Sequence, residues 1–316
     1  MSKYLVRRVL VAIPTLFAVS ILLFGLIHLA PGGPAAMYAS PEAGPEDIAR
    51  LEHLFGTDQP LPVQYWNWLS DMFHLDWGTS FRYREPVTEV LWGRAPNTIQ
   101  LMIVALVIAV VLSVPFGVVA AISKRRWVQY TASILSILGI SIPTFWLGMM
   151  LLLTFSVRWR LLPSGGNLTI GADFNLWDWF IHIIGPASVL ATLFIAAWSR
   201  YVRSSMLEVI SQDYIKLARA KGLKESVVIY RHALRNALLP LVTLIGLQGG
   251  SLIGGAMITE VVFAWPGMGK LLADSLTSRD YPVLMATFMI MAILTVAGNL
   301  IADLTYGWID PRIKVG

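Results

Sequence analysis

Residues 213–240 read Asp213-Tyr-Ile-Lys-Leu-Ala-Arg-Ala-Lys-Gly222-Leu-Lys-Glu-Ser-Val-Val-Ile-Tyr-Arg-His-Ala-Leu-Arg-Asn-Ala-Leu-Leu-Pro240, a basic stretch between two strongly apolar runs. Asp213 is able to cap the start of a helix, the residues after it are good helix formers, and Gly222 fits the position just past a helix end. We therefore predict a short helix over residues 214–221, a turn at Leu223 and Lys224, and a second helix that leads into the next apolar run.

Two roles are open for this short helix from its residues alone. Its basic side chains keep it out of hydrocarbon, and Ala218 and Ala220 leave a small, flat face that a groove on a partner protein could accept. A basic helix could equally lie on anionic lipid headgroups, where each Lys or Arg contributes about 1 kcal/mol.

The composition places the chain in a membrane. Only 14% of its 316 residues are charged and 56% are hydrophobic, and the mean hydropathy is +0.65, whereas soluble domains carry about 25% charged residues. The net charge of +5 lies in short segments between apolar runs, which is typical of membrane orientation and argues against a nucleic-acid binder. Cysteine is absent from the sequence, which excludes disulfides, thiolate metal sites and a cysteine nucleophile.

Six apolar runs approach the roughly 20 residues that a helix needs to cross a bilayer core of about 30 Å. They cover residues 9–30, 99–122, 130–157, 180–198, 237–259 and 281–302. Several contain proline, which frees a backbone carbonyl, so we expect kinks that face neighbouring helices. The sequence predicts an all-α integral membrane protein with six transmembrane helices.

Positive charge indicates the orientation of these spans. One set of alternate connecting segments holds twice as many Lys and Arg as the other set, and the richer set is expected in the cytoplasm. Both termini and the loop 200–236 then lie inside. The predicted organisation is a cytoplasmic N-terminus and first helix at 1–30, an external segment at 31–97, a core with five helices at 98–303, and a cytoplasmic tail at 304–316.

Three glycines repeat every four residues in the fifth predicted span, at Gly246, Gly250 and Gly254. Small residues at this spacing let two helix backbones approach closely. Tight packing inside the chain and a contact between two subunits both fit this pattern.

Ionisable residues are scarce inside the predicted spans. His28, Glu260 and Asp303 lie near span ends, where we expect them to reach headgroups or water. Because a charge within a membrane marks function by default, their absence from the span centres argues against a carrier coupled to protons or sodium. The polar side chains that could line a pathway are Ser141, Thr144, Gln248 and Ser251.

Motifs for enzyme chemistry are missing from the sequence. Residues 267–271 have a superficial likeness to a phosphate-binding loop, but they lack its first glycine and the Ser or Thr after Lys270. The five histidines form no zinc-spaced pair with a carboxylate. Energy for any active transport must therefore come from another protein.

Several motifs together resemble one family. Ala218-Arg-Ala-Lys-Gly222, with Arg231-His-Ala-Leu-Arg-Asn-Ala-Leu-Leu-Pro240 after it, resembles the coupling-loop signature of permease subunits of dipeptide/oligopeptide-type ATP-binding-cassette (ABC) importers. The likeness extends over nearly the whole chain, through Arg7-Arg8, Ile13-Pro-Thr15, Leu29-Ala-Pro-Gly32, Asp58-Gln-Pro-Leu-Pro-Val-Gln-Tyr65, Asp76-Trp-Gly-Thr-Ser80, Ile140-Ser-Ile-Pro-Thr-Phe-Trp-Leu-Gly148, Glu260-Val-Val-Phe-Ala-Trp-Pro-Gly-Met-Gly269 and Asp303-Leu-Thr-Tyr-Gly-Trp-Ile-Asp-Pro-Arg312. The general importer signature starts with Glu-Ala-Ala, whereas Lys216, Leu217 and Ala218 stand here, as is typical of the peptide branch.

This resemblance implies the type I ABC importer permease fold, in a bacterial or archaeal inner membrane. The expected partners are a second homologous permease, two ABC ATPases and an external substrate-binding protein. ATP and Mg would be bound by the ATPases, with no cofactor, metal or catalytic residue on this chain. The residues implied in contact with an ATPase are Asp213, Tyr214, Leu217, Ala218, Arg219, Ala220, Lys221, Gly222 and Leu223.

The cargo stays open at this point, since similar permeases carry dipeptides, oligopeptides, glutathione, nickel complexes or haem. An ion-coupled secondary transporter or channel is the alternative function. It would show uptake that follows an ion gradient and survives ATP depletion.

Overall fold

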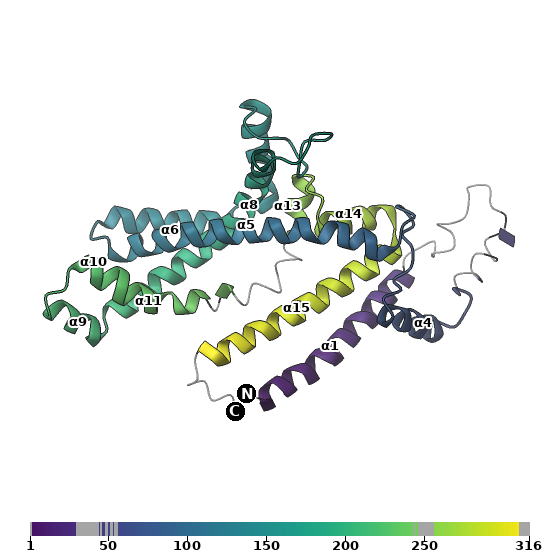
Figure 1. Ribbon diagram of the computed structural model, residues 1–316, viewed down its shortest axis with the longest axis horizontal. Helices are drawn as coiled ribbons and strands as arrows, with labels where there is room; N and C mark the ends of the chain where they lie inside the picture. Colours follow the sequence, from purple (N-terminus) through teal and green to yellow (C-terminus); the bar gives the residue numbers. More distant parts are fainter. Residues whose placement is uncertain are drawn as a thin grey trace.

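The computed structural model describes residues 2–29, 44, 46–47, 50, 53, 56–242, 244–245 and 256–309 (Figure 1). Within these ranges the chain is helical, apart from connecting segments and one isolated bridge between Thr79 and Pro86. The helices are α1 Ser2–His28, α4 Leu61–Phe73, α5 Val87–Ile122, α6 Arg126–Ser141, α7 Thr144–Leu151, the π-helix η1 Leu152–Arg158, α8 Leu176–Ile210, α9 Asp213–Ala220, α10 Glu225–Val227, the π-helix η2 Val228–Ala233, α11 Leu234–Ala237, α13 Met257–Val262, α14 Met268–Ser278 and α15 Tyr281–Ile309.

Four single helices in the described ranges are long and apolar enough to cross a membrane, and one bent pair adds a fifth candidate. The four are Leu10–His28, Val87–Ile122, Leu176–Ile210 and Tyr281–Leu300, which overlap the spans predicted at 9–30, 99–122, 180–198 and 281–302. Much of the span predicted at 237–259 lies outside the described residues, together with Gly246, Gly250, Gly254, Gln248 and Ser251. The count of six spans therefore stays a prediction.

The helices α5 and α8 form the centre of the fold, where they pack along much of their length (Figure 1). Small residues make this close approach possible: Ala105, Ala109 and Ala187 are fully buried. At Gly117 a Cβ atom would lie only 2.6 Å from the Cβ of Val202. A side chain at this position would therefore push the two helices apart.

The third predicted span, 130–157, is broken instead of kinked. The axes of Arg126–Ser141 and Thr144–Arg158 differ by 99°. Ile142 is extended, with φ −77° and ψ 123°, because the ring of Pro143 disfavours a helical conformation in the residue before it. Pro143 then precedes the first turn of α7, where its missing N–H is tolerated. The expectation of a continuous kinked helix was wrong here.

The helix α4 packs on α1 and α15 at one end of the molecule (Figure 1). Tyr65 and Leu69 of α4 join Phe24 and Met285 in one buried cluster, and the hydroxyls of Ser20 and Tyr65 are 2.8 Å apart. The helix α15 runs antiparallel to α1, so the start of α1 and the end of α15 lie on the same side (Figure 1).

Candidate functional site

The short helix predicted in the basic stretch is present as α9, Asp213–Ala220, at the end of the molecule opposite α4 (Figure 1). Asp213 is its first residue, and Gln212 takes the capping position that we had expected for Asp213. An aspartate in the first turn still interacts favourably with the helix dipole. Gly222 has φ +77° and its N–H donates to the carbonyl of Arg219, so its predicted place just past the helix end is confirmed.

One face of α9 anchors it to the rest of the chain. Ile215 is fully buried and Ala218 is 8% exposed, and both belong to a cluster that includes Met206 of α8 and Val228 and Ile229 of η2. Burying an isoleucine side chain contributes about 2–3 kcal/mol. Helices of eight residues are marginal in water on their own, so this anchor holds α9 as a helix.

The other face of α9 is largely exposed. Tyr214 and Leu217 are 42% and 56% exposed, and Ala220 is also exposed. Ala218 and Ala220 therefore do not share one flat face as the sequence suggested, because residues two apart on a helix point in nearly opposite directions. The exposed surface of this segment, which we call the α9 face, consists of Tyr214, Leu217, Ala220, Lys221 and Leu223.

Polar contacts hold the turn after α9 in shape. The guanidinium of Arg219 donates to Glu225 across Gly222, with N–O distances of 2.7 and 3.2 Å. These hydrogen bonds from Arg219 lower the pKa of Glu225, and its carboxylate raises the pKa of Arg219. The side-chain amide of Asn236 donates to the hydroxyl of Tyr214 at 2.7 Å, which ties the α9 face to the helix that follows.

The sequence did not reveal this set of contacts, although their residues lie inside the quoted motifs. Among the residues that hold α9 in place, Ile215 could have been recognised as an anchor, because it is an apolar residue in a basic segment. Asn236 has no such feature in the sequence. The predicted second helix is present, but its middle is the π-helix η2, whose Val228 and Ala233 are fully buried. Single π-turns inside helices occur often at functional sites.

The described candidates for a polar pathway flank the break between α6 and α7. Ser141 is exposed, and its hydroxyl donates to the carbonyl of Ile137 at 2.9 Å, as serines in such helices commonly do. Thr144 is the first residue of α7 and is half-buried. The structure brings these two side chains to one bend, and their role in a pathway stays a prediction.

Glu260 lies in a different environment from the one we expected. It is fully buried instead of reaching headgroups or water. Its carboxylate accepts hydrogen bonds from the Thr98 hydroxyl at 2.7 Å and the Lys270 N–H at 2.9 Å, while the Thr98 oxygen accepts from the Met268 N–H at 2.8 Å. The carboxylate thus occupies the N-terminus of α14, where exposed N–H groups favour an anion.

This network explains the Glu260–Gly269 motif. A Cβ atom on Gly267 would overlap the carboxylate of Glu260 and the hydroxyl of Thr98, and one on Gly269 would overlap the backbone of Met257. Of the two glycines that resembled a phosphate loop, Gly267 makes room for the chain's own carboxylate and Gly269 for the backbone of Met257.

A second buried carboxylate joins the segment before α5 to the start of α15. Asp280 is fully buried and accepts hydrogen bonds from the Ser80 hydroxyl and from the N–H groups of Phe81 and Arg82, the latter two at 3.1 and 3.3 Å. The Ser80 oxygen accepts from the N–H of Tyr83 at 2.9 Å. The Asp76–Ser80 motif therefore ends at a joint between two distant segments.

Comparison with known proteins gives consistent matches along the chain. Residues 113–315 match the family model "Binding-protein-dependent transport system inner membrane component", and residues 1–102 match the model of its N-terminal region. The oligopeptide transport system permease protein AppB of Bacillus subtilis is 44% identical, over 99% of this chain and 100% of its own length.

Two further relatives are named for other cargoes. The dipeptide transport system permease protein DppB of Alkalihalophilus pseudofirmus is 39% identical, over 99% of this chain and all of its own. The glutathione transport system permease protein GsiC of Salmonella typhimurium is 41% identical, over 99% of both chains. The chain therefore belongs to the family of binding-protein-dependent transport system inner membrane components, as a permease subunit of an ABC importer.

Proposed function

We propose that this chain forms half of the membrane channel of an importer for dipeptides or oligopeptides. This choice of cargo is supported by relatives with 39–44% identity along their whole length, which are named for the transport of oligopeptides, dipeptides and glutathione. A second homologous permease would complete the channel, two ABC ATPases would bind on the cytoplasmic side, and a binding protein would deliver cargo from outside.

In this proposal the chain has six spans with both termini in the cytoplasm. The antiparallel arrangement of α1 and α15 supports a common side for the two ends (Figure 1). The basic residues of the α9 segment support a cytoplasmic position for that side. Reporter fusions to each terminus test the orientation, and an external carboxyl terminus would contradict the six-span proposal.

The single observation that carries the mechanism is the two-faced structure of α9. The α9 face is exposed and would enter a cleft on an ATPase. Asp213, Arg219 and Gly222 shape this segment but do not form its apolar surface. Its buried face, through Ile215 and Ala218, is packed on α8 and η2. A displacement imposed on α9 is therefore passed to α8 as a rigid movement, because packed cores deform little.

ATP hydrolysis by the partners would then drive the two permeases between outward-open and inward-open states. An ion-coupled transporter or channel is the alternative. The fully buried carboxylates Glu260 and Asp280 do not favour it, because both are occupied by hydrogen bonds from this chain.

The experiment is transport by the assembled complex in proteoliposomes. Uptake of labelled peptide should require ATP and the binding protein, and should persist when ionophores remove ion gradients. Ala220→Asp should abolish cargo-stimulated ATP hydrolysis while assembly into the membrane is retained, because it places a charge in the α9 face. Ser226→Asp adds the same charge at an exposed site in α10 and serves as the control. Uptake that follows an ion gradient without ATP would overturn the proposed function.

A further inference from the structure

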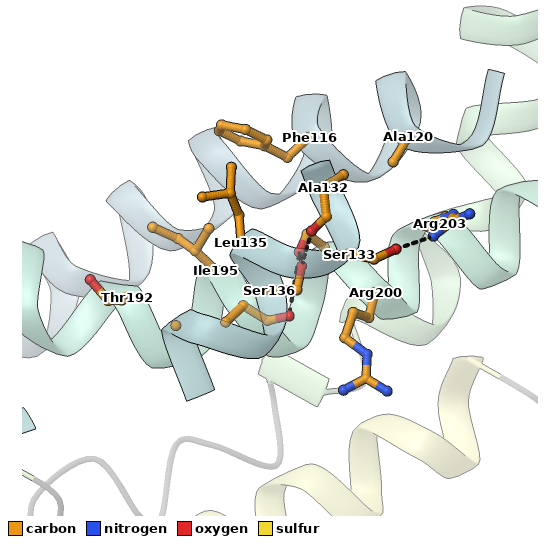
Figure 2. A pocket seen from close by; sticks show the side chains of 13 residues that line it. Phe116, Ala120, Ala132, Ser133, Leu135, Ser136, Thr192, Ile195, Arg200 and Arg203 are labelled. Carbon is orange, nitrogen blue, oxygen red and sulfur yellow. Dashed lines mark hydrogen bonds between the residues drawn. The ribbon is translucent and has the colours of Figure 1, made fainter. Parts of the chain in front are cut away.

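A groove between α6 and α8 contains two arginines of α8, Arg200 and Arg203 (Figure 2). A cavity of about 140 Å³ and a wider one of about 740 Å³ adjoin there, since Ser133, Arg200 and Arg203 line both. The smaller cavity extends between α5, α6 and α8, and its large apolar lining residues are Phe116, Leu135 and Ile195. The groove therefore joins a cationic site to an apolar chamber.

Some N–H donors of these arginines have no acceptor among the described residues. Arg203 donates from Nη1 to the Ser133 hydroxyl at 2.8 Å, while its Nε is buried and has no hydrogen-bond partner in the part of the chain that the structure describes. Within that same part, neither Arg200 nor Arg203 forms an ion pair with a carboxylate. A buried donor left without an acceptor is costly, so the Nε of Arg203 is a donor that a bound ligand with an acceptor oxygen would satisfy.

The site lies near the ends of α6 and α8 that charge assigns to the cytoplasmic side, just past the span predicted at 180–198. Arg203 lies about 10 Å along α8 from its end at Ile210, and Ser133 lies about 10 Å along α6 from its start at Arg126. The exposed side chains around the wider cavity are mainly apolar: Ile137, Ile140, Tyr201 and Leu207. Such a surface on membrane-spanning helices is covered by lipid or by another protein.

We propose that this groove binds an anionic phospholipid. Its headgroup phosphate lies between Arg200 and Arg203, where guanidinium donors match phosphate oxygens. One acyl chain enters the apolar chamber beside Phe116. A lipid fits better than the carboxylate of a cargo molecule, because cargo is present only during transport, whereas guanidinium groups at this depth need a counter-ion in every state. The proposal does not depend on which cargo is carried.

The test is labelling by phosphatidylglycerol that carries a photoreactive diazirine near the end of one acyl chain. The assembled complex is placed in phosphatidylcholine nanodiscs with a limiting amount of this probe. Label is expected on peptides that contain Phe116, Leu135 and Ile195. The double variant Arg200→Gln, Arg203→Gln should need about thirty-fold more probe for equal labelling, since each arginine contributes about 1 kcal/mol.

Two further variants separate this site from general charge and from misfolding. Arg125→Gln with Arg126→Gln removes the same charge from the nearby start of α6 and should leave the labelling unchanged. Ala132→Phe keeps both arginines but fills the chamber that Ala132 lines, so label on the chamber should fall while the complex still elutes as a single assembly.

Three results would overturn the proposal. The first is equal labelling of the wild type and the double glutamine variant. The second is an unlabelled groove in the wild-type complex, which would show that a protein partner covers it. The third is loss of label on adding millimolar trialanine but not trialanine amide, which would assign the arginines to a cargo carboxylate.

Discussion

Replacing Ile215 by alanine should detach α9 from the bundle without changing its α9 face. Ile215 is fully buried among Met206, Val228 and Ile229, and truncating a buried isoleucine to alanine costs about 2–5 kcal/mol. The eight-residue helix has little stability of its own, so most of this loss falls on the local docking of α9. A loss of about 3 kcal/mol raises the open fraction of the segment by about two orders of magnitude.

Hydrogen exchange of the amides of residues 213–223 in the isolated permease pair measures this opening directly. In Ile215→Ala their exchange should accelerate by about a hundred-fold, while amides at the centres of α5 and α8 keep their protection. Cargo-stimulated ATP hydrolysis by the full complex should be lost in the same variant, because a detached α9 transmits no movement to α8.

The matched control lies two residues away, on the opposite face of α9. Leu217 is 56% exposed, and Leu217→Ala should change stability by no more than about 0.5 kcal/mol and leave hydrogen exchange unaltered. It should nevertheless weaken the binding of the ATPase. Unchanged exchange in Ile215→Ala, or faster exchange in Leu217→Ala, would refute the assignment of an anchoring face and an outward face.

Three other substitutions test separate parts of the structure. Gly222→Pro should uncouple ATP hydrolysis from transport, while Gly222→Asn should keep most of the coupled hydrolysis. The φ angle is +77° at this position, whereas proline is held near −65° and asparagine tolerates the left-handed region. Equal activities of the two variants would contradict this reason. Glu260→Ala should lower the midpoint of thermal unfolding of the complex by several degrees more than Glu260→Gln. The alanine leaves the Thr98 hydroxyl and the Lys270 N–H buried without a partner, which costs about 1–3 kcal/mol for each group. Equal melting temperatures of the two variants would contradict the role of this buried network. Gly117→Leu should prevent stable assembly, judged by size-exclusion chromatography, whereas Gly93→Leu, at a glycine with open space around it, should be tolerated.

The local features of the basic stretch were predictable because they depend on neighbouring residues. A helix stop at Gly222 needs only a residue that adopts positive φ, and the structure has this stop where we predicted it. The positions of four spans were also predictable, since roughly 20 apolar residues in a row have no other stable environment. The start of α5 at Val87 was not predicted, and the external position of residues 31–97, which include it, stays a prediction.

Features that depend on distant residues were missed or assigned wrongly. Glu260 was expected at a surface because a charge near a span end usually reaches water, and nothing adjacent in sequence shows that Thr98 lies beside it. The same limit applies to Asp280, whose partners come from residues 80–82. Pro143 itself indicates that the helix is interrupted there. The 99° angle between the two helices could not be predicted, because it depends on how they pack against the rest of the chain.

By itself, the sequence determined that this chain is a helical membrane protein with a short basic helix between two apolar runs. Composition, hydrophobic run length and helix-end residues act locally, so they can be understood without coordinates. Only the tertiary structure decided which face of that helix is available to a partner: Ala218 is buried and Leu217 is exposed. The physical reason is that burial depends on which surfaces α8 and η2 present to α9. Packing between different segments of the chain cannot be read from the sequence of any single segment.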